Sequence, residues 1–389
     1  MRVRKFRFDR PQQIAALLLL FLASQSVWVI DHRALTPRDY QYARCGREMW
    51  ERPSPLAGYF TSCGNLQDGT LAYRAAGLPL TAARIVFGLS RETSTWEMRH
   101  VVTFIPLLLS LPFLLAGLGL GGALWWVARR LYGNAGGYVA LALYCCCPEV
   151  VRACSAPNNE ILAAFGLYAA VYTAIGVAHA MHGPLLKWRP RIVLLIACFG
   201  FTAAAHVSAV LLAFLLGACF MIYLAVGRRA FLLPVALITA VGTLLLLFAS
   251  YGFRPDPFSY VFRGGAGRMW FSLEHLRALF SLRGDTGLAG AGITLAVLAA
   301  LVLFAGSRRS RYFGNTAPLL VSALLLPLVT TGVVSEPWLW AMPFLLTFVG
   351  GVFADALETV YRRTFLVATG AILLVQAGLS LASLGAMSN

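Results

Sequence analysis

The chain has 389 residues, of which 59% are hydrophobic and only 12% are charged. Because roughly a quarter of the residues of a soluble domain carry charge, this composition excludes an ordinary soluble fold and indicates an integral membrane protein. The apolar runs are uniform rather than alternating, which excludes a transmembrane β-barrel. The net charge of +16 arises from arginines at the ends of apolar runs, so membrane topology explains it and no nucleic-acid partner is expected.

The apolar segments predict an all-α bundle of about eleven transmembrane helices, since about 20 apolar residues cross about 30 Å of hydrocarbon as a helix. The first run has no A-x-A-like cleavage site close behind it, so we interpret it as a retained helix rather than a signal peptide. The third and fifth runs are short enough to be re-entrant or tilted. The predicted spans are 14–30, 101–127, 136–150, 160–180, 192–205, 207–226, 231–251, 287–306, 318–334, 338–357 and 364–387.

Basic clusters follow alternate spans and predict the orientation. With eleven alternating spans, every cluster lies on the same side as the basic N-terminus, which the positive-inside rule assigns to the cytoplasm. The C-terminus and two long loops, 31–100 and 252–286, are then exported. We expect one polytopic membrane domain over 1–389. The later clusters lie at 129–130, 187–191, 228–229, 308–311 and 362–363.

The two long exported loops are the segments most suited to function, because connections of that length are usually functional or disordered. The first contains a helical pattern at 37–51 and a semi-apolar stretch at 75–89 suited to the membrane interface. The second interleaves arginines with aromatic residues. Both loops could cover a cavity at the exported side of the bundle.

Cysteine placement agrees with this topology. Cys45 and Cys63 lie in the first exported loop, where a disulfide would contribute about 3 kcal/mol, and the bridged and free states both stay open. The run Cys145-Cys146-Cys147 cannot converge on one metal ion, because adjacent helical residues point about 100° apart. These cysteines are interpreted as small buried hydrophobes.

The first candidate catalytic residue in the chain is Asp39. Thr36 is a predicted helix N-cap, Pro37 takes the first helical position, and Asp39 stands at N3 to complete a capping box. Asp39 is therefore either a capping carboxylate or an exposed carboxylate able to act as a base.

Two further polar positions leave similar alternatives open. Asn158 or Asn159 either caps the helix that contains Glu160 or binds a sugar. His206 is either a buried imidazole bonded to a neighbouring helix or part of a cavity.

The segments Asp39-Tyr40-Gln41-Tyr42 and Gly46-Arg47-Glu48-Met49 resemble the D-E-x-x-Y-x-x-x-x-R element of the GT-C glycosyltransferases. The resemblance is to the branch that contains protein O-mannosyltransferases and the aminoarabinose transferase of lipid A. Tyr40 stands where the second acid is usual. Arg99 resembles the arginine before the second span, and the turn Leu131-Tyr132-Gly133 resembles an R-x-x-G cytoplasmic connection.

The stretch 148–162 resembles the second polar motif of the same family, although no Asp stands in it. It contains Arg152 and then Asn158-Asn159-Glu160. His206 follows the short fifth span, in a segment where the family often has a lysine. The resemblance covers about residues 10–225.

The resemblance implies an inverting enzyme of the bacterial inner membrane that moves a sugar from a polyprenyl-phosphate donor to an exported lipid, glycan or protein acceptor. Such a transfer needs a base for the acceptor proton and cations for the departing phosphate. Asp39 would be the base, with its active site on the exported side. The implied substrate-binding residues are Arg99, Arg152, Asn159, Glu160, His206, Arg263 and Arg268. No metal ligand is implied, and the need for a divalent cation stays open.

Three alternatives accompany this expectation. Any single loop arginine could instead snorkel toward lipid head groups. A GT-C-shaped protein lacking catalysis could serve as a membrane assembly partner, which the missing second acid favours. A transporter is disfavoured because acids of the predicted spans, such as Glu160 and Asp355, lie near span ends.

Overall fold

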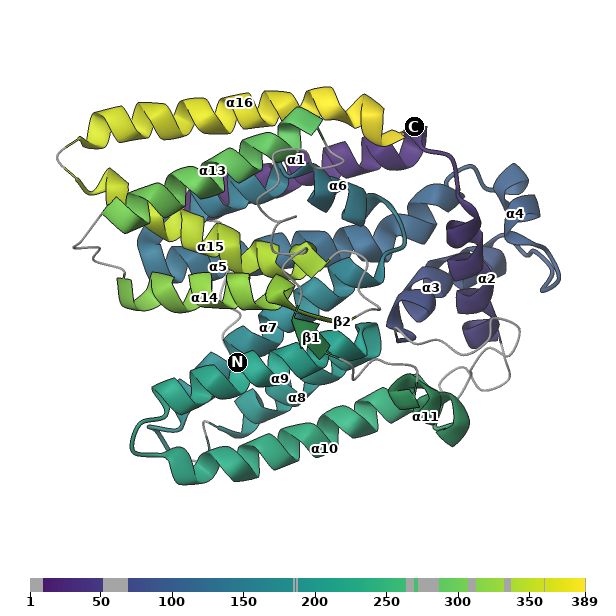
Figure 1. The fold of residues 1–389 in the computed structure, drawn as a ribbon. Coiled ribbons are helices and arrows are strands. Elements are labelled where there is room, and N and C mark those ends of the chain that lie inside the picture. Colours follow the sequence, from purple (N-terminus) through teal and green to yellow (C-terminus); the bar gives the residue numbers. More distant parts are fainter. Residues whose placement is uncertain are drawn as a thin grey trace, which may run out of the picture.

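The structure is a computed structural model that shows a bundle of long helices with a cap of shorter ones (Figure 1). Every predicted span coincides at least in part with a helix, which satisfies backbone hydrogen bonds internally, as a bilayer requires. The described residues are 10–51, 69–184, 186, 188–263, 269–271, 287–306, 313–331, 337–359 and 361–388.

The elements of the first half are all helical. In chain order they are α1 (Arg10–His32), α2 (Pro37–Glu51), α3 (Leu71–Val86), α4 (Thr95–Val101), α5 (Ile105–Cys145), α6 (Pro148–Ser155) and α7 (Asn159–Ala180). The predicted helix at 37–51 matches α2, and the stretch at 75–89 falls largely on α3.

The second half adds further helices and one short antiparallel strand pair, in which Trp270 lies opposite Thr330. The helices are α8 (Arg189–Ala205), α9 (Val207–Leu224), the 3₁₀ turn η2 (Arg229–Phe231), α10 (Leu232–Ser250), α11 (Pro255–Arg263), α13 (Gly287–Gly306), α14 (Phe313–Leu328), α15 (Pro337–Leu357) and α16 (Arg362–Ser388). The strands are β1 (Met269–Phe271) and β2 (Val329–Thr331). The fold class is therefore all-α, as predicted.

Two predicted span boundaries are wrong, and the span count is not confirmed. The predicted span 136–150 crosses a break before Pro148, where α6 begins, and the predicted span 318–334 runs past the end of α14 into β2. Within the described ranges, eight helices are long and apolar enough to cross a membrane. The figure of about eleven spans stays a prediction.

The long element α5 is a pair of antiparallel helices that reverse at Gly133. Gly133 has φ +77°, a conformation that side chains with a Cβ disfavour. Tyr144 Oη donates to the carbonyl of Gly117 at 2.8 Å across the pair. This reversal confirms the predicted turn at 131–133 and separates the segments predicted as the second and third spans.

Helix α15 is the most buried of the eight candidate spans, whereas α10 and α16 are the most exposed. Helix α15 approaches the second half of α5 closely, since a Cβ added at Gly350 would lie 2.5 Å from the carbonyl oxygen of Gly136. Small residues allow such close helix contacts in membranes. Helix α15 therefore lies at the centre of the bundle, and the exposed leucines and valines of α10 and α16 suit contact with lipid.

The bundle has two distinct ends. In Figure 1, α2, α3, α4 and α11 gather at one end, and the connections from α9 to α10 and from α15 to α16 lie at the other. At this second end the Trp188 and Phe231 rings pack at 5.2 Å, and the Trp126 and Tyr172 rings at 5.4 Å. These contacts bring the described arginines of three clusters together, opposite the α2 end; they lie at 129–130, 189–191 and 228–229. The cytoplasmic identity of this basic end remains a prediction.

Candidate functional site

Helix α2 is held against α3 by two glycines. A Cβ added at Gly46 would overlap the carbonyl of Tyr73, and one added at Gly77 would overlap the backbone of Gly46. At this crossing, the ring of Tyr42 stacks on that of Tyr73 with centroids 4.3 Å apart. The close contact buries the face of α2 that carries Asp39 and Tyr42.

Asp39 forms the predicted capping box. Its Oδ2 accepts the backbone N–H of Thr36 at 2.8 Å and the Thr36 hydroxyl at 2.9 Å, and the N–H of Asp39 donates to Thr36 Oγ1 at 3.3 Å. The expectation of an exposed carboxylate is wrong, because Asp39 is only 3% exposed. Packing of α2 against its neighbours removes this acid from bulk water.

Arg33 is the principal site residue that the sequence did not suggest. Its Nη1 lies 2.8 Å from Asp39 Oδ2, and its Nη2 lies 3.4 Å from Asp39 Oδ1. The same guanidinium donates to the carbonyl of Ser155 at 2.9 Å and to Ser110 Oγ at 3.4 Å. Arg33 therefore ties the start of α2 to α5 and to the end of α6. The available signal was a basic side chain directly after the first predicted span, six residues before Asp39.

Tyr42 joins α2 to the start of α7, where its hydroxyl donates to Asn159 Oδ1 at 3.2 Å. Asn158, not Asn159, is the helix cap, because its Oδ1 accepts the N–H of Glu160 at 2.7 Å. The buried Nδ2 of Asn159 has no hydrogen-bond partner among the described residues. Asn158 therefore takes the capping role, and the side chain of Asn159 remains available to a ligand. Glu160 lies beside it and is also buried.

His206 lies in the break between α8 and α9 and caps α9. Its Nδ1 accepts the N–H of Ser208 at 3.2 Å, so we assign the proton of the neutral ring to Nε2. Burial lowers the pKa of His206 to about 4, which keeps the ring neutral at pH 7. Its ring meets that of Trp340 edge-on at 5.1 Å.

Several buried polar atoms at this end of the bundle have no hydrogen-bond partner within the part of the chain that the structure describes. They include the side-chain donors Asn159 Nδ2, His206 Nε2 and Trp340 Nε1. Helices α7 and α8 meet through Phe165 and Phe201 at 5.9 Å, a register that brings the start of α7 next to His206. Because buried polar atoms are nearly always hydrogen-bonded, these donors indicate a place for a polar ligand.

Of the arginines predicted to bind the donor phosphate, the structure describes the side chain of Arg152 alone. Arg152 lies in the last turn of α6, is half-buried, and makes no hydrogen bond or ion pair with the described residues. The side chain of Arg99 in α4 and that of Arg263 at the end of α11 lie outside the described residues, as does Arg268 altogether. Their predicted contacts with phosphate stay predictions.

Cys45 is disulfide-bonded. Cys63 lies outside the described residues, so the pairing of Cys45 with Cys63 stays a prediction. The run Cys145-Cys146-Cys147 is buried, as expected of small hydrophobes. No group of three or more His, Cys, Asp or Glu side chains within the described ranges is placed to hold a metal ion.

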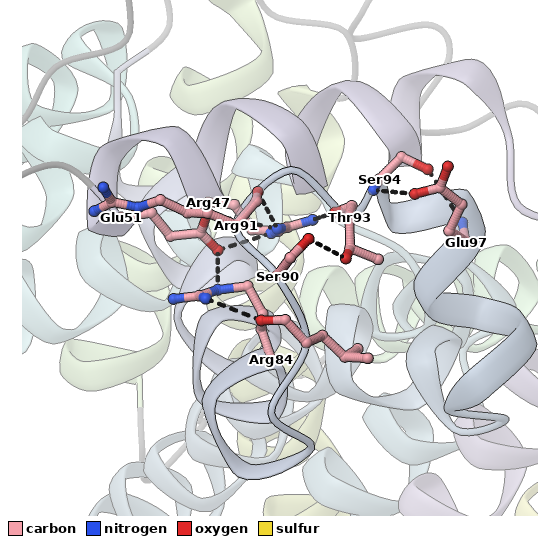
Figure 2. A network of polar contacts seen from close by, with 9 residues as sticks. Arg47, Glu51, Arg84, Ser90, Arg91, Thr93, Ser94 and Glu97 are labelled. Atoms are coloured by element: carbon pink, nitrogen blue, oxygen red, sulfur yellow. Dashed lines mark hydrogen bonds and ion pairs between the residues drawn. The ribbon is translucent and has the colours of Figure 1, made fainter.

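A charged network holds the outer side of α2, as Figure 2 shows. Glu51 Oε1 accepts Arg47 Nε at 2.9 Å and Arg84 Nε at 3.0 Å, while Arg47 Nη1 donates to the carbonyl of Thr93 at 2.8 Å. The network fixes the loop before α4 against α2 and α3.

An open groove of about 720 Å³ lies between this loop and α2. Tyr40 and Trp96 line it, with ring centroids 6.3 Å apart. Charged side chains of both signs, among them Arg44, Glu48 and Glu92, line it as well.

Sequence comparison finds no matching family model and no matching curated protein, whereas comparison of structures finds proteins of similar fold. ArnT from Cupriavidus metallidurans is similar in the apo state and bound to undecaprenyl phosphate, with TM-scores of 0.58 and 0.60 and 15% sequence identity. These matches cover 96% of this chain and 74% and 77% of the ArnT chain.

The archaeal oligosaccharyltransferase AglB from Archaeoglobus fulgidus, in complex with an inhibitory peptide and a dolichol-phosphate, has a TM-score of 0.51 at 12% identity. That match covers 96% of this chain and 56% of AglB. The chain therefore has the GT-C fold, as the sequence resemblance implied.

Proposed function

We propose that this protein transfers a sugar from a polyprenyl-phosphate donor to an exported acceptor. The observation that carries the proposal is the gathering of a buried acid, Asp39, and three unpaired polar atoms at one end of a GT-C bundle. The similar structures of ArnT with undecaprenyl phosphate and of AglB with dolichol-phosphate support this donor class. The proposed location is the bacterial inner membrane, with the site on the exported side.

Asp39 Oδ1 is the proposed base. Oδ2 already accepts three hydrogen bonds, from Arg33 and twice from Thr36. Among the described residues, Oδ1 receives only the Nη2 of Arg33, at 3.4 Å, and a carboxylate oxygen has two lone pairs to offer. Oδ1 can therefore accept the proton of an acceptor hydroxyl as the new glycosidic bond forms. Arg33 positions the carboxylate through this ion pair.

Arg152 is the proposed partner of the donor phosphate. Its half-buried guanidinium has no protein partner in the described part of the chain, so it can form a bidentate contact with phosphate oxygens. A fixed cation stabilises the charge that develops on the phosphate when the sugar leaves. Arg99, Arg263 and Arg268 are proposed to contribute to the same role.

The sugar is proposed to fill the space beside the unpaired donors. Asn159 Nδ2, His206 Nε2–H and Trp340 Nε1–H would each donate to a sugar hydroxyl or ring oxygen, and the neutral imidazole adds no charge that would favour a second phosphate. Glu160, next to Asn159, is proposed to accept from a sugar hydroxyl. Attack by the activated acceptor from the side opposite the phosphate would invert the anomeric centre.

The groove beside Tyr40 and Trp96 is the proposed entrance for the acceptor. It opens next to the N-terminal turn of α2, and its aromatic side chains suit the apolar faces of a sugar or lipid. The acceptor class, whether lipid, glycan or protein, is left to experiment.

A second candidate is a non-catalytic assembly partner with the same fold. The observation that favours it is the complete engagement of Asp39 Oδ2 in the capping box and the ion pair with Arg33. In this case Asp39 would serve stability alone.

Identification of the copurified lipid tests the proposed function directly. The protein would be extracted in mild detergent and its bound lipids analysed by mass spectrometry, then incubated with a panel of polyprenyl-phosphate sugars and acceptors. We expect bound polyprenyl phosphate and turnover of at least one donor. Protein that neither holds nor consumes any donor of the panel would favour the assembly partner.

A further inference from the structure

A second cavity lies at the basic end of the bundle, away from Asp39. It has a volume of about 680 Å³ and lies between α5, α7, α8, α9, α14 and α15. Its floor is apolar and includes the buried side chains of Tyr168, Leu319 and Phe344. Its wall includes the exposed Leu194. The cavity therefore offers apolar surface to a hydrocarbon chain.

The side chains of this cavity that can carry charge near neutral pH are all basic. Arg130 from α5, His179 from α7 and Arg191 from α8 line it, and none of its lining residues is acidic. The guanidinium of Arg130 lies over the Trp126 ring, 5.4 Å from its centroid. Arg191 Nη1 donates to the carbonyl of Gly176 at 2.5 Å. The two guanidinium groups are thus held by different helices at the edge of one cavity.

We propose that this cavity binds an anionic phospholipid of the leaflet at the basic end of the bundle. Arg130 and Arg191 would hold the headgroup phosphate with the fork geometry that suits guanidinium. An acyl chain would enter between Leu194 and Phe344. Basic pockets between transmembrane helices on the cytoplasmic side bind anionic headgroups in this way. Snorkelling of each arginine toward the head groups would not explain why two arginines from different helices line one cavity with an apolar floor.

A lipid is favoured over a free phosphate because the cavity is larger and more apolar than a headgroup alone requires. A free anion would contact the arginines and leave Tyr168, Leu319 and Phe344 unused. The proposal is independent of the proposed glycosyl transfer, since Asp39, Asn159 and His206 lie at the other end.

Native mass spectrometry of the detergent-purified protein tests the site with phosphatidylglycerol as the probe. The variant Arg130→Gln/Arg191→Gln should bind this lipid at least tenfold more weakly than the wild type. The matched control Arg228→Gln/Arg229→Gln removes two exposed arginines of the same end that do not line the cavity, and it should bind as the wild type does. Equal loss in both variants, or no loss in either, would overturn the proposal.

Measurements on the wild type keep the test decisive if the double variant does not fold. Phosphatidylcholine with the same acyl chains should bind at least tenfold more weakly than phosphatidylglycerol, because its headgroup has no net negative charge. Soluble glycerol phosphate at equal concentration should not displace the bound lipid. Equal affinity for the two lipids would contradict the role of the arginines, and displacement by glycerol phosphate would show that the cavity recognises phosphate alone.

Discussion

Arg33 and Asp39 form an ion pair at the start of α2, with Arg33 Nη1 2.8 Å from Asp39 Oδ2 and side chains only 10% and 4% exposed. Six residues separate the partners in sequence, yet the pair also contacts α5 and α6 through Ser110 and Ser155. The proposed base is therefore placed by an arginine that also contacts two other parts of the bundle, α5 and α6.

Replacement of Arg33 by Met should lower the free energy of unfolding by about 3 kcal/mol, since removal of one partner leaves a buried charge uncompensated. Thermal unfolding in detergent measures the change. Arg91→Gln is the control, because Arg91 is exposed, and it should change stability by less than about 0.5 kcal/mol. Equal stability of the Arg33 variant and the control would show that the ion pair is not maintained in the protein.

Gly46→Ala should disrupt the packing of α2 on α3, because the added Cβ would overlap the carbonyl of Tyr73, which is backbone and cannot rotate away. We expect loss of folded protein, or a large fall in the unfolding temperature. Gly122→Ala is the same change at a position with no atom within 4 Å. It should be neutral or stabilise by about 0.5–1 kcal/mol, because alanine favours the helix. A fully stable Gly46→Ala variant would exclude the close crossing.

Tyr42→Phe removes the donor to Asn159 Oδ1 and leaves that buried oxygen unpaired. The expected cost is about 1–2 kcal/mol of stability, together with a higher KM for the donor if Asn159 contacts the sugar. Tyr223→Phe is the matched control, because Tyr223 is 65% exposed. If the two variants have the same KM and the same stability, then Tyr42 does not position Asn159.

Stability should fall with acidification through His206. Its pKa in the folded protein is depressed to about 4, from an unfolded value near 6.5, so the unfolded state binds a proton first as the pH falls. The contribution of His206 is fully present above pH 6.5 and is lost between pH 6.5 and 4, by up to about 1.4 kcal/mol per pH unit.

His206→Asn keeps a capping oxygen for α9 but cannot titrate, so its unfolding temperature should vary less over this pH range. His182→Gln removes an exposed histidine and should retain the wild-type dependence. If the unfolding temperature depends on pH with the same slope in the wild type and in His206→Asn, then the pKa of His206 is not depressed.

Much of the fold followed from local signals in the sequence. Apolar length located the long helices, Thr36-Pro37 located the start of α2, and Gly133 located the reversal within α5. These features depend on residues close together in the chain. The exact ends of 136–150 and 318–334 were missed because apolar composition alone does not show where a helix stops.

The candidate site could be predicted only in part from such local signals. Asp39, Asn159 and His206 were identified individually, but their surroundings depend on contacts between distant segments. The ring pair of His206 and Trp340 joins residues more than a hundred positions apart, and the overlap of Gly46 with Gly77 appears only when two helices cross. Arg33 looked like any other loop arginine until α5 and α6 supplied its other partners.

The rate of glycosyl transfer by Asp39→Asn, measured beside Thr36→Ala, tests the central claim most directly. Both changes weaken the capping box, at a cost of about 1 kcal/mol for the loss of the Thr36 hydroxyl, but only the first removes the proposed base. With the copurified donor and equal amounts of folded protein, Asp39→Asn should be slower than the wild type by about 10²–10⁴, and Thr36→Ala should stay within about threefold. If both variants transfer sugar at nearly the wild-type rate, then Asp39 is a structural cap and the account of the base is wrong.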